Sequence, residues 1–426
     1  MKKVLVVTYY WPPAGGPGVQ RWLKFVKYLP EFDIEPIVYC PKNPSYPTLD
    51  HSLEQEIDDE LTVLKSTLWE PNSLLKFGFK NKIKTFSKGH IPPKERQRLF
   101  DRIVLSLRGN CFIPDARKFW VKPSVKLLSK YISKHQIDTI ITTGPPHSLH
   151  LIGMQLKARH SLRWIADFRD PWTAISYHDQ LYLSFFAQQK HKALEAQVLK
   201  TADHIITTSE ATKRLFDPDT TKPITTVTNG FDAQTLPKFT LDKAFTLTQI
   251  GALHSDRNPT LLWAVLSELM TEYQEFKKDF ELVLVGDVSS HVRASIRAFG
   301  VESALRCVGP VPHAEAITFQ HKTQVLLLIE ANTTAASYII PGKLFEYLNA
   351  QRPIVALGPK TSDIQAILKD TETGVYFDYT AQSALKSHIL KLYHTYKNQR
   401  LTVSPKHLDR YSRRSCTKQL AEVILR

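Results

Sequence analysis

Short apolar segments alternate with longer helical stretches along the whole chain, and this rhythm constrains the fold more than any other feature. Apolar runs separated by helical patterns predict parallel strands joined by crossover helices. Several runs end in small or polar residues, as strands do when their carboxyl ends face a ligand site. The sequence therefore predicts an α/β fold with two parallel-sheet domains. The expected strands span residues 4–8, 36–40, 138–142, 164–168, 204–208, 224–227, 245–250, 282–285, 325–329, 354–357 and 375–377.

The length of 426 residues exceeds one ordinary hydrophobic core, which favours two domains. The segment 232–237 is polar, has no clear period and separates the two groups of strands. We therefore expect a first domain over residues 1–235 and a second over residues 240–404. Apolar side chains recur at helical spacing in residues 405–426, which predicts a terminal helix.

The composition favours an anionic partner and an intracellular setting. Lysine and arginine number 56 against 41 aspartates and glutamates, a formal net charge of +15. Nucleic acid, a phosphorylated substrate and an anionic bilayer all suit this charge. The four cysteines form no CxxC pair, so neither a disulfide framework nor a zinc site is predicted and a reducing cytoplasm is expected. No apolar run is long enough for a signal peptide or a transmembrane helix.

The octapeptide PGKLFEYL, residues 341–348, is the strongest candidate for a ligand site. A helical spacing of three places Lys343 and Glu346 on one face, and the preceding Pro341 and Gly342 leave the first N–H groups of the helix available to an anion. This turn can hold a phosphate-sized anion and a sugar diol together. The alternative is an ordinary amphipathic helix with a surface lysine and glutamate.

Three further loops suit contact with a phosphorylated ligand. Gly15 and Gly16 lie in the loop YYWPPAGGPGVQR, which lacks both the GxGxxG and the GxxxxGK[ST] spacing. Gly251 allows a diphosphate to approach the backbone, and Arg257 in the same loop adds a planar cation that pairs with Lys343 as a clamp. The turn VGPV, which ends at Val311, suits backbone contact with a base. A structural turn is the alternative for each loop.

Two polar strand ends in the first half are candidates for binding a second substrate. In WIADFRDPW, Asp167 and Asp170 are expected to bind hydroxyl groups and Arg169 a hydroxyl or a phosphate. The alternative is an internal Asp–Arg salt bridge with Trp172 in the core. In TTGPPHSLH, His147 or His150 is a candidate for substrate binding or proton transfer, and a helix-capping or surface histidine is the alternative.

These passages together resemble the retaining, family 4 type glycosyltransferases of GT-B fold over nearly the whole chain. The matching passages are the YYWPPAGGPGVQR loop, WIADFRDPW, TTSEATKRLF with VTNGFD, QIGALHSDRNP, ELVLVGD and PGKLFEYLNAQRPIVALG. The resemblance implies two Rossmann-like domains facing across a cleft, with the acceptor site in the first and the donor site in the second. It also implies that the terminal helix at 405–426 packs on the first domain.

The resemblance further assigns roles to individual residues. Gly16 is expected near the donor diphosphate or the transferred sugar, Arg257 and Lys343 on the leaving diphosphate, and Glu346 on the nucleotide ribose. Many family members carry a second glutamate eight positions before the ribose-binding one, and here that position is Tyr338. Glu330 is the nearest upstream carboxylate. The histidine of the family's acceptor domain has no clear counterpart, so His147 and His150 are assigned by proximity.

A basic amphipathic stretch from Lys76 to Arg108 forms part of an expected insertion at about residues 70–125. Its lysines and arginines alternate with aromatic and aliphatic residues, which suits an anionic bilayer. A solvated helix pair is the alternative, and nucleic acid is the third choice because no nucleic-acid-binding motif accompanies the charge.

We therefore predict a glycosyltransferase that moves a sugar from a nucleotide-sugar to a cell-surface glycan or lipid-linked acceptor, with retention. No DxD motif lies between an expected strand and a turn, and no cofactor motif is found, so no metal and no cofactor are expected. The expected location is the cytoplasm, peripheral at the inner face of the cytoplasmic membrane. A nucleotide-sugar epimerase of similar fold and a catalytically inactive membrane-associated binding protein are the alternatives.

Overall fold

The structure is a computed structural model that describes residues 1–69, 99–175, 178, 180–232 and 239–426. The chain forms two compact units. Unit 1 comprises Met1–Asn229 and Arg413–Arg426, and unit 2 comprises Gly230–Ser412. Both chain ends therefore belong to unit 1.

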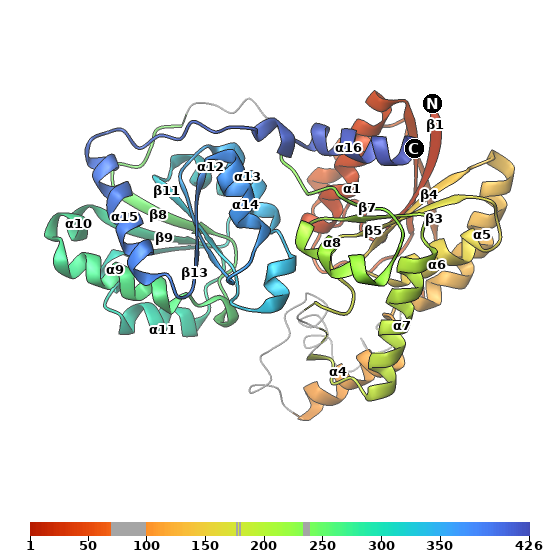
Figure 1. The fold of residues 1–426 in the computed structure, drawn as a ribbon, viewed down its shortest axis with the longest axis horizontal. Coiled ribbons are helices and arrows are strands. Elements are labelled where there is room, and N and C mark those ends of the chain that lie inside the picture. Colours follow the sequence, from red (N-terminus) through yellow and green to blue (C-terminus); the bar gives the residue numbers. More distant parts are fainter. Residues whose placement is uncertain (70–98, 176–177, 179, 233–238) are drawn as a thin grey trace. The chain divides into compact units, whose positions relative to one another are not determined.

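Unit 1 contains a parallel sheet whose described strands follow the order β3-β2-β1-β4-β5-β6-β7, with helices on both faces (Figure 1). Its strands are β1 (Lys2–Val7), β2 (Ile34–Pro41), β3 (Thr62–Ser66), β4 (Thr139–Gly144), β5 (Arg163–Phe168), β6 (His204–Thr207) and β7 (Ile224–Thr226). Its helices are α1 (Pro17–Tyr28), α4 (Leu99–Cys111), α5 (Lys118–His135), α6 (Ser148–Lys157), α7 (Phe185–Thr201), α8 (Glu210–Phe216) and α16 (Arg413–Leu425).

The central strand β1 shows why the strands of unit 1 read as continuous apolar runs. Leu5 and Val7 pack with α5 and α6, whereas Val4 and Val6 pack on the opposite face with α1 and α16. Both faces of the strand are therefore buried, as the crossover helices of a parallel sheet require.

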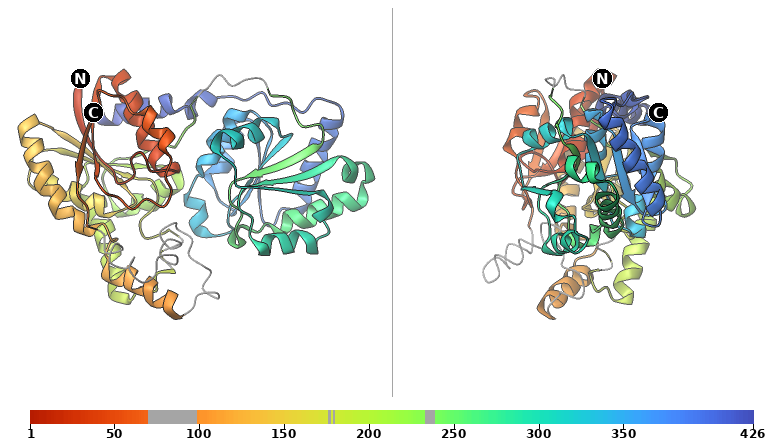
Figure 2. Two further views of the ribbon diagram at one scale, coloured as in Figure 1. Left: turned by 180° about the vertical axis from the view of Figure 1, so that it is seen from behind. Right: turned by 90° about the vertical axis from the view of Figure 1, so that its left-hand side faces the viewer.

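The C-terminal helix α16 lies beside α1 in unit 1 (Figure 2). Cys416, Leu420 and Ile424 are buried in the same core cluster as Trp22 of α1. Arg413 donates hydrogen bonds to the backbone carbonyl and the side chain of Gln20, at 3.0 and 2.7 Å. The helix is thus part of the hydrophobic core of unit 1.

Unit 2 contains a second parallel sheet whose described strands follow the order β10-β9-β8-β11-β12-β13. Its strands are β8 (Phe245–Ile250), β9 (Phe280–Val285), β10 (Leu305–Gly309), β11 (Val325–Ile329), β12 (Ile354–Gly358) and β13 (Gly374–Asp378). Its helices are α9 (Thr260–Glu272), α10 (Gln274–Asp279), α11 (Ser290–Ala298), α12 (His313–Lys322), α13 (Gly342–Ala350), α14 (Asp363–Thr371) and α15 (Gln382–Lys397).

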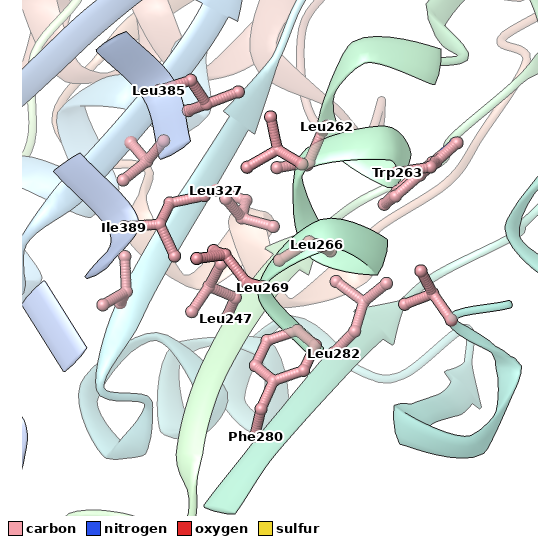
Figure 3. Close-up of a cluster of buried hydrophobic side chains, with 14 of the residues drawn as sticks. Leu247, Leu262, Trp263, Leu266, Leu269, Phe280, Leu282, Leu327, Leu385 and Ile389 are labelled. Atoms are coloured by element: carbon pink, nitrogen blue, oxygen red, sulfur yellow. The ribbon is translucent and has the colours of Figure 1, made fainter. Parts of the chain in front are cut away.

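One face of this second sheet is covered by α9 and α15 (Figure 3). Leu262 and Leu266 of α9 meet Leu385 and Ile389 of α15 over Leu327 of β11, and all of these side chains are fully buried. The other face is covered by α13 and α14. The helix α13, which carries Lys343 and Glu346, is therefore anchored by its apolar side directly on the sheet.

The prediction of two Rossmann-like parallel-sheet domains in an α/β fold is confirmed. The strands β3 and β10 were not predicted. Both lie at sheet edges, and their residues are mostly part-exposed, so their sequences TVLKS and LRCVG lack the continuous apolar run of a central strand. No helix in the described ranges is both long and apolar enough to cross a membrane.

The topology of each sheet marks one place for a ligand. In unit 1 the strand order changes direction between β1 and β4, and in unit 2 between β8 and β11. The loops at the carboxyl ends of two such neighbouring strands leave in opposite directions, which opens a crevice above the sheet. In unit 2 these loops begin at Gly251 and Glu330, and in unit 1 at Thr8 and around Pro145.

Candidate functional site

The loop after β8 is held close to the loop after β9 by backbone contacts. Leu253 donates a hydrogen bond to the carbonyl of Asp287 at 2.8 Å, and Ser289 donates one to Leu253 at 3.1 Å. Gly251 has a φ of 99°, a conformation that favours glycine, and a Cβ at Gly286 would lie 2.6 Å from the Gly251 carbonyl oxygen. Among the described residues, apart from Gly251 and its two chain neighbours, no heavy atom lies within 4 Å of the place where a Gly251 Cβ would stand. The backbone at Gly251 is therefore fixed and open on that side.

Two cations lie near one buried carboxylate at this edge of the unit 2 sheet. Arg257 belongs to the short turn after β8, and its Nη2 lies 3.9 Å from Oε2 of Glu330 at the end of β11. Lys343 lies in the first turn of α13 and interacts electrostatically with Glu330, Arg257 and Glu346. Topology thus brings together four charged residues that the sequence spreads over 90 positions.

The ammonium group of Lys343 has a pKa lowered to about 8. Partial burial is the main cause, Arg257 lowers the pKa further, and Glu330 and Glu346 raise it. The structure records no ion pair for Lys343 within its described residues. No side chain caps the start of α13, so its first N–H groups add to the positive potential at this end of the helix. This cation is therefore suited to a strongly anionic ligand.

Glu346 lies beside two residues of the neighbouring helix α12 and is held by one of them, Gln320. Gln320 donates a hydrogen bond from Nε2 to Oε2 of Glu346 at 2.7 Å, and Nε2 of His313 lies 3.9 Å from Oε1. The Glu346 side chain remains 34% exposed, whereas Gln320 is buried. Gln320 was not predicted from the sequence, because no local pattern indicates which helix packs beside α13. Val311 precedes α12, is partly buried and packs on the hydrophobic core that α13 and α14 share with the sheet.

In unit 1 the glycine-rich loop after β1 leads directly into α1. Gly15 donates a backbone hydrogen bond to Thr48 at 3.0 Å, and Gly16 occupies the N-cap position of α1 without any side-chain cap. A Cβ at Gly18 would lie 2.4 Å from Nη1 of Arg169, so the guanidinium group lies against the start of the helix. The structure thereby places Arg169 against Gly18, two positions after the predicted Gly16.

Arg169 is fixed by the carbonyls of another loop. Its Nε donates to the Gly144 carbonyl at 3.4 Å and its Nη2 to the carbonyl of Pro145, while the guanidinium group lies 5.5 Å from the centre of the Tyr10 ring. Its Nη1 lies against Gly18 in the first turn of α1.

Asp167 is fully buried and bound on all sides by donors. Its carboxylate accepts hydrogen bonds from Arg21 Nη2 at 2.9 Å, Trp22 Nε1 at 2.8 Å and Thr143 Oγ1 at 2.8 Å. Burial opposes its ionisation, but the charge of Arg21 and these hydrogen bonds together hold its pKa below the usual range. This geometry matches the internal salt bridge that the sequence left open, with Arg21 rather than Arg169 as the partner. Direct contact of Asp167 with an acceptor stays a prediction.

Asp170 differs from Asp167 although it lies only three residues away. It is partly buried, and no hydrogen bond of its carboxylate is recorded within the described part of the chain. Burial raises its pKa, and the charge of Arg169 partly offsets this effect. Trp172 is a core residue, with its indole N–H donating to His191 Nδ1 at 3.1 Å. Of the two predicted aspartates, Asp170 is the one with a carboxylate left to bind a ligand.

His147 and His150 are both buried beside the end of β4. His147 stacks on Trp172 with ring centres 4.9 Å apart, and neither of its ring nitrogens has a partner among the described residues. His150 Nδ1 lies 2.9 Å from Thr142 Oγ1, and its Nε2 has no such partner. Burial lowers the pKa of His147 well below its usual value and that of His150 to about 3. Both imidazoles are therefore neutral at neutral pH, and their catalytic role stays a prediction.

A comparison with protein families matches residues 18–235 to the model of Glycosyltransferase Family 4, just over half of the chain. The chain belongs to glycosyltransferase family 4. The matched range covers most of unit 1, including α1, Arg169, Asp170 and the two histidines. Comparison with curated protein sequences finds no match.

Solved structures show that the fold of this family 4 glycosyltransferase is shared along its whole length. Sucrose-phosphate synthase from Thermosynechococcus elongatus is 12% identical with a TM-score of 0.62, covering 100% of this chain and 98% of its own. HepE from Anabaena in complex with UDP is 13% identical with a TM-score of 0.62, covering 100% of both chains. The lipopolysaccharide outer core galactosyltransferase WaaB is 13% identical with a TM-score of 0.60, covering 99% of both. These likenesses confirm the GT-B fold.

Proposed function

We propose that this glycosyltransferase takes its sugar from a nucleotide-sugar bound in unit 2. The observation that carries the proposal is the grouping of Arg257, Lys343 and Glu346 at the β8–β11 switch point. Two cations suit a diphosphate, and a partly exposed carboxylate held by Gln320 suits the vicinal hydroxyls of a ribose. HepE, which shares the fold, has been solved with UDP and with UDP-glucose, in keeping with such a donor.

The proposed chemistry places these residues at the leaving group. The bond from the anomeric carbon to the diphosphate oxygen breaks, its electron pair goes to that oxygen, and an acceptor hydroxyl oxygen bonds to the carbon. Arg257 and Lys343 stabilise the negative charge that builds on the diphosphate. We propose that this pair makes a metal unnecessary, that a hexose or related sugar is moved, and that its configuration is retained. Gly251 gives the diphosphate backbone access, and Val311 lies beside the base.

We further propose that unit 1 binds the acceptor, a cell-surface glycan or a lipid-linked sugar. Asp170 and Arg169 are the groups best placed to bind its hydroxyls, while Asp167 positions the loop through Arg21. Neutral His147 or His150 accepts the proton of the attacking hydroxyl in this scheme. Gly15 and Gly16 retain their predicted role in donor binding as part of the proposal.

A membrane-facing surface is the remaining part of the proposal. Residues 76–98 of the predicted basic stretch lie outside the described residues, but its end forms α4. This helix exposes the apolar side chains of Leu99, Phe100, Ile103 and Leu107, and α7 begins with the exposed Phe185 and Phe186. Asn110 fixes α4 to the segment before α7, because its Nδ2 donates to the Tyr182 carbonyl at 3.1 Å and its Oδ1 accepts from the Ser184 N–H at 2.8 Å. We propose that this face lies on the anionic inner surface of the cytoplasmic membrane.

Vesicle sedimentation tests this surface. Replacing Phe185 and Phe186 with serine, or neutralising the lysines and arginines of 76–108, is expected to reduce binding to phosphatidylglycerol-containing vesicles at least about tenfold, since both apolar insertion and charge contribute. Binding that stays unchanged in both variants contradicts the membrane proposal. Phosphatidylcholine vesicles are the control for the contribution of the membrane's negative charge to binding.

The proposed reaction is tested by incubating the protein with UDP-sugars and GDP-sugars, with and without lipid-linked acceptors. Release of UDP or GDP that depends on acceptor supports transfer, and the anomeric configuration of the product tests retention. A sugar that isomerises without acceptor would identify an epimerase. Activity in the presence of EDTA tests metal independence.

The pH dependence of kcat/KM tests Lys343 separately. Its pKa of about 8 means that the cation is present below pH 8 and is lost as the pH rises through that value. We therefore expect kcat/KM, which reports the free enzyme, to fall about tenfold per pH unit above pH 8. Arginine stays protonated in this range, so Lys343→Arg is expected to move the fall to higher pH. An alkaline fall that is the same in both proteins contradicts the assignment.

A further inference from the structure

Glu330 is fixed by its backbone at the point where the unit 2 sheet changes direction. It follows β11 directly, its N–H donates to the Leu357 carbonyl at 2.8 Å, and its own carbonyl accepts a hydrogen bond from Tyr379 Oη at 2.7 Å. Its side chain is 5% exposed. The backbone of Glu330 is therefore held in place by two neighbouring segments.

The carboxylate of Glu330 is buried without a hydrogen bond. Within the described residues Oε1 has no partner, and Oε2 lies 3.9 Å from Arg257 Nη2, which is too far for a hydrogen bond. A buried carboxylate normally accepts several hydrogen bonds, because leaving it without them costs free energy. By contrast, the carboxylate of Asp167 in unit 1, which is also buried, is bound by three different side chains. Glu330 thus has acceptor capacity that the chain itself does not use.

The surroundings restrict what can use this capacity. The diphosphate of a nucleotide-sugar is fully ionised at neutral pH, so it has no proton to donate and is repelled by a carboxylate. The partner must therefore carry hydroxyl or amino groups. Arg257 and Lys343 beside Glu330 suit a diphosphate, so the donor group must belong to something joined to that diphosphate. Glu346 is the carboxylate that we propose for the ribose. The transferred sugar is therefore the part of the donor whose hydroxyl groups are available to Glu330.

We propose that Glu330 binds a hydroxyl group of the transferred sugar and is a specificity-determining residue of the donor site. This inference rests on the proposed use of a nucleotide-sugar. It supplies a sugar-binding carboxylate from the end of β11 in a chain that has Tyr338 where many relatives carry a glutamate.

Equilibrium binding of UDP and GDP, and of the nucleotide-sugar that the wild type binds from a panel of UDP-sugars and GDP-sugars, tests this role. Glu330→Leu removes the acceptor and one negative charge beside two cations. We expect it to bind the nucleoside diphosphate as well as the wild type or more tightly, and to bind the nucleotide-sugar at least about tenfold more weakly. Glu330→Gln keeps one acceptor oxygen, so its affinity for the nucleotide-sugar is expected to lie between those of the wild type and of Glu330→Leu.

Glu346→Gln is the matched control. Loss of a ribose contact is expected to weaken the binding of the nucleoside diphosphate and of the nucleotide-sugar by the same factor. If the Glu330 variants weaken both ligands equally, the residue only positions the cations and the proposal is wrong. Unchanged binding of both ligands also overturns it. A wild type that binds none of the probes refutes the nucleotide-sugar function itself, which is a different result. Thermal unfolding establishes that each variant is folded.

Discussion

Replacing Lys343 with alanine is expected to lower kcat by about 100- to 1000-fold while the protein stays folded. The ammonium group is proposed to stabilise charge that develops on the diphosphate only as the glycosidic bond breaks, and loss of one such donor typically has this effect. Its partial burial strengthens the interaction, because the surrounding dielectric is low. Initial rates of UDP or GDP release at saturating donor measure the change.

Lys369 provides the matched control for this substitution. It is an exposed lysine on α14 of the same unit, so Lys369→Ala removes the same charge and side chain without touching the β8–β11 switch point. We expect its kcat to equal that of the wild type. Lys343→Arg is expected to retain much of the activity at pH 7, because the charge is kept. A full kcat in Lys343→Ala would leave the proposed leaving-group stabilisation without support.

Arg257→Ala is expected to act on the same step as Lys343→Ala. Because both cations are assigned to one diphosphate, the double variant should be less impaired than the product of the two single effects predicts. Additive losses would instead indicate that the two residues bind separate groups.

The sequence predicted the central parts of this fold because local patterns determine them. The runs VLVV and VLLLI are buried on both faces of a sheet, so periodicity alone identifies them as strands. PGKLFEYL forms the predicted helix α13, with Leu344, Phe345 and Leu348 on the sheet and Lys343 and Glu346 partly exposed. Edge strands such as β3 carry no equivalent signal.

The partners of the charged residues were not predictable in the same way, because they depend on how distant segments pack. Asp167 was expected to bind hydroxyl groups, with an internal Asp–Arg salt bridge as the alternative, and the arginine that it pairs with is Arg21, which is 146 positions away. Likewise, Gln320 meets Glu346 only because α12 packs beside α13. The sequence showed which residues carry charge at the strand ends, and the fold determines which of these charges are satisfied internally.

Asp167→Asn is expected to lower the free energy of unfolding by about 3–5 kcal/mol, because it leaves the buried guanidinium of Arg21 without its counter-charge. Both side chains of this pair are almost fully buried, at 0% and 1% exposure, so solvent cannot replace the lost partner. Urea unfolding followed by circular dichroism measures the change.

Asp170→Asn is the matched control three residues along the chain. Its carboxylate is partly buried and has no recorded hydrogen bond within the described residues, so we expect a change below about 1 kcal/mol, in the range of ordinary substitutions. Acceptor turnover should show the reverse pattern, with Asp170→Asn reducing kcat/KM for the acceptor in a fully folded enzyme. Adding Arg21→Met to Asp167→Asn removes the stranded charge and should restore part of the lost stability. An Asp167→Asn variant that unfolds like the wild type but fails to use its acceptor would instead place Asp167 in direct contact with the acceptor.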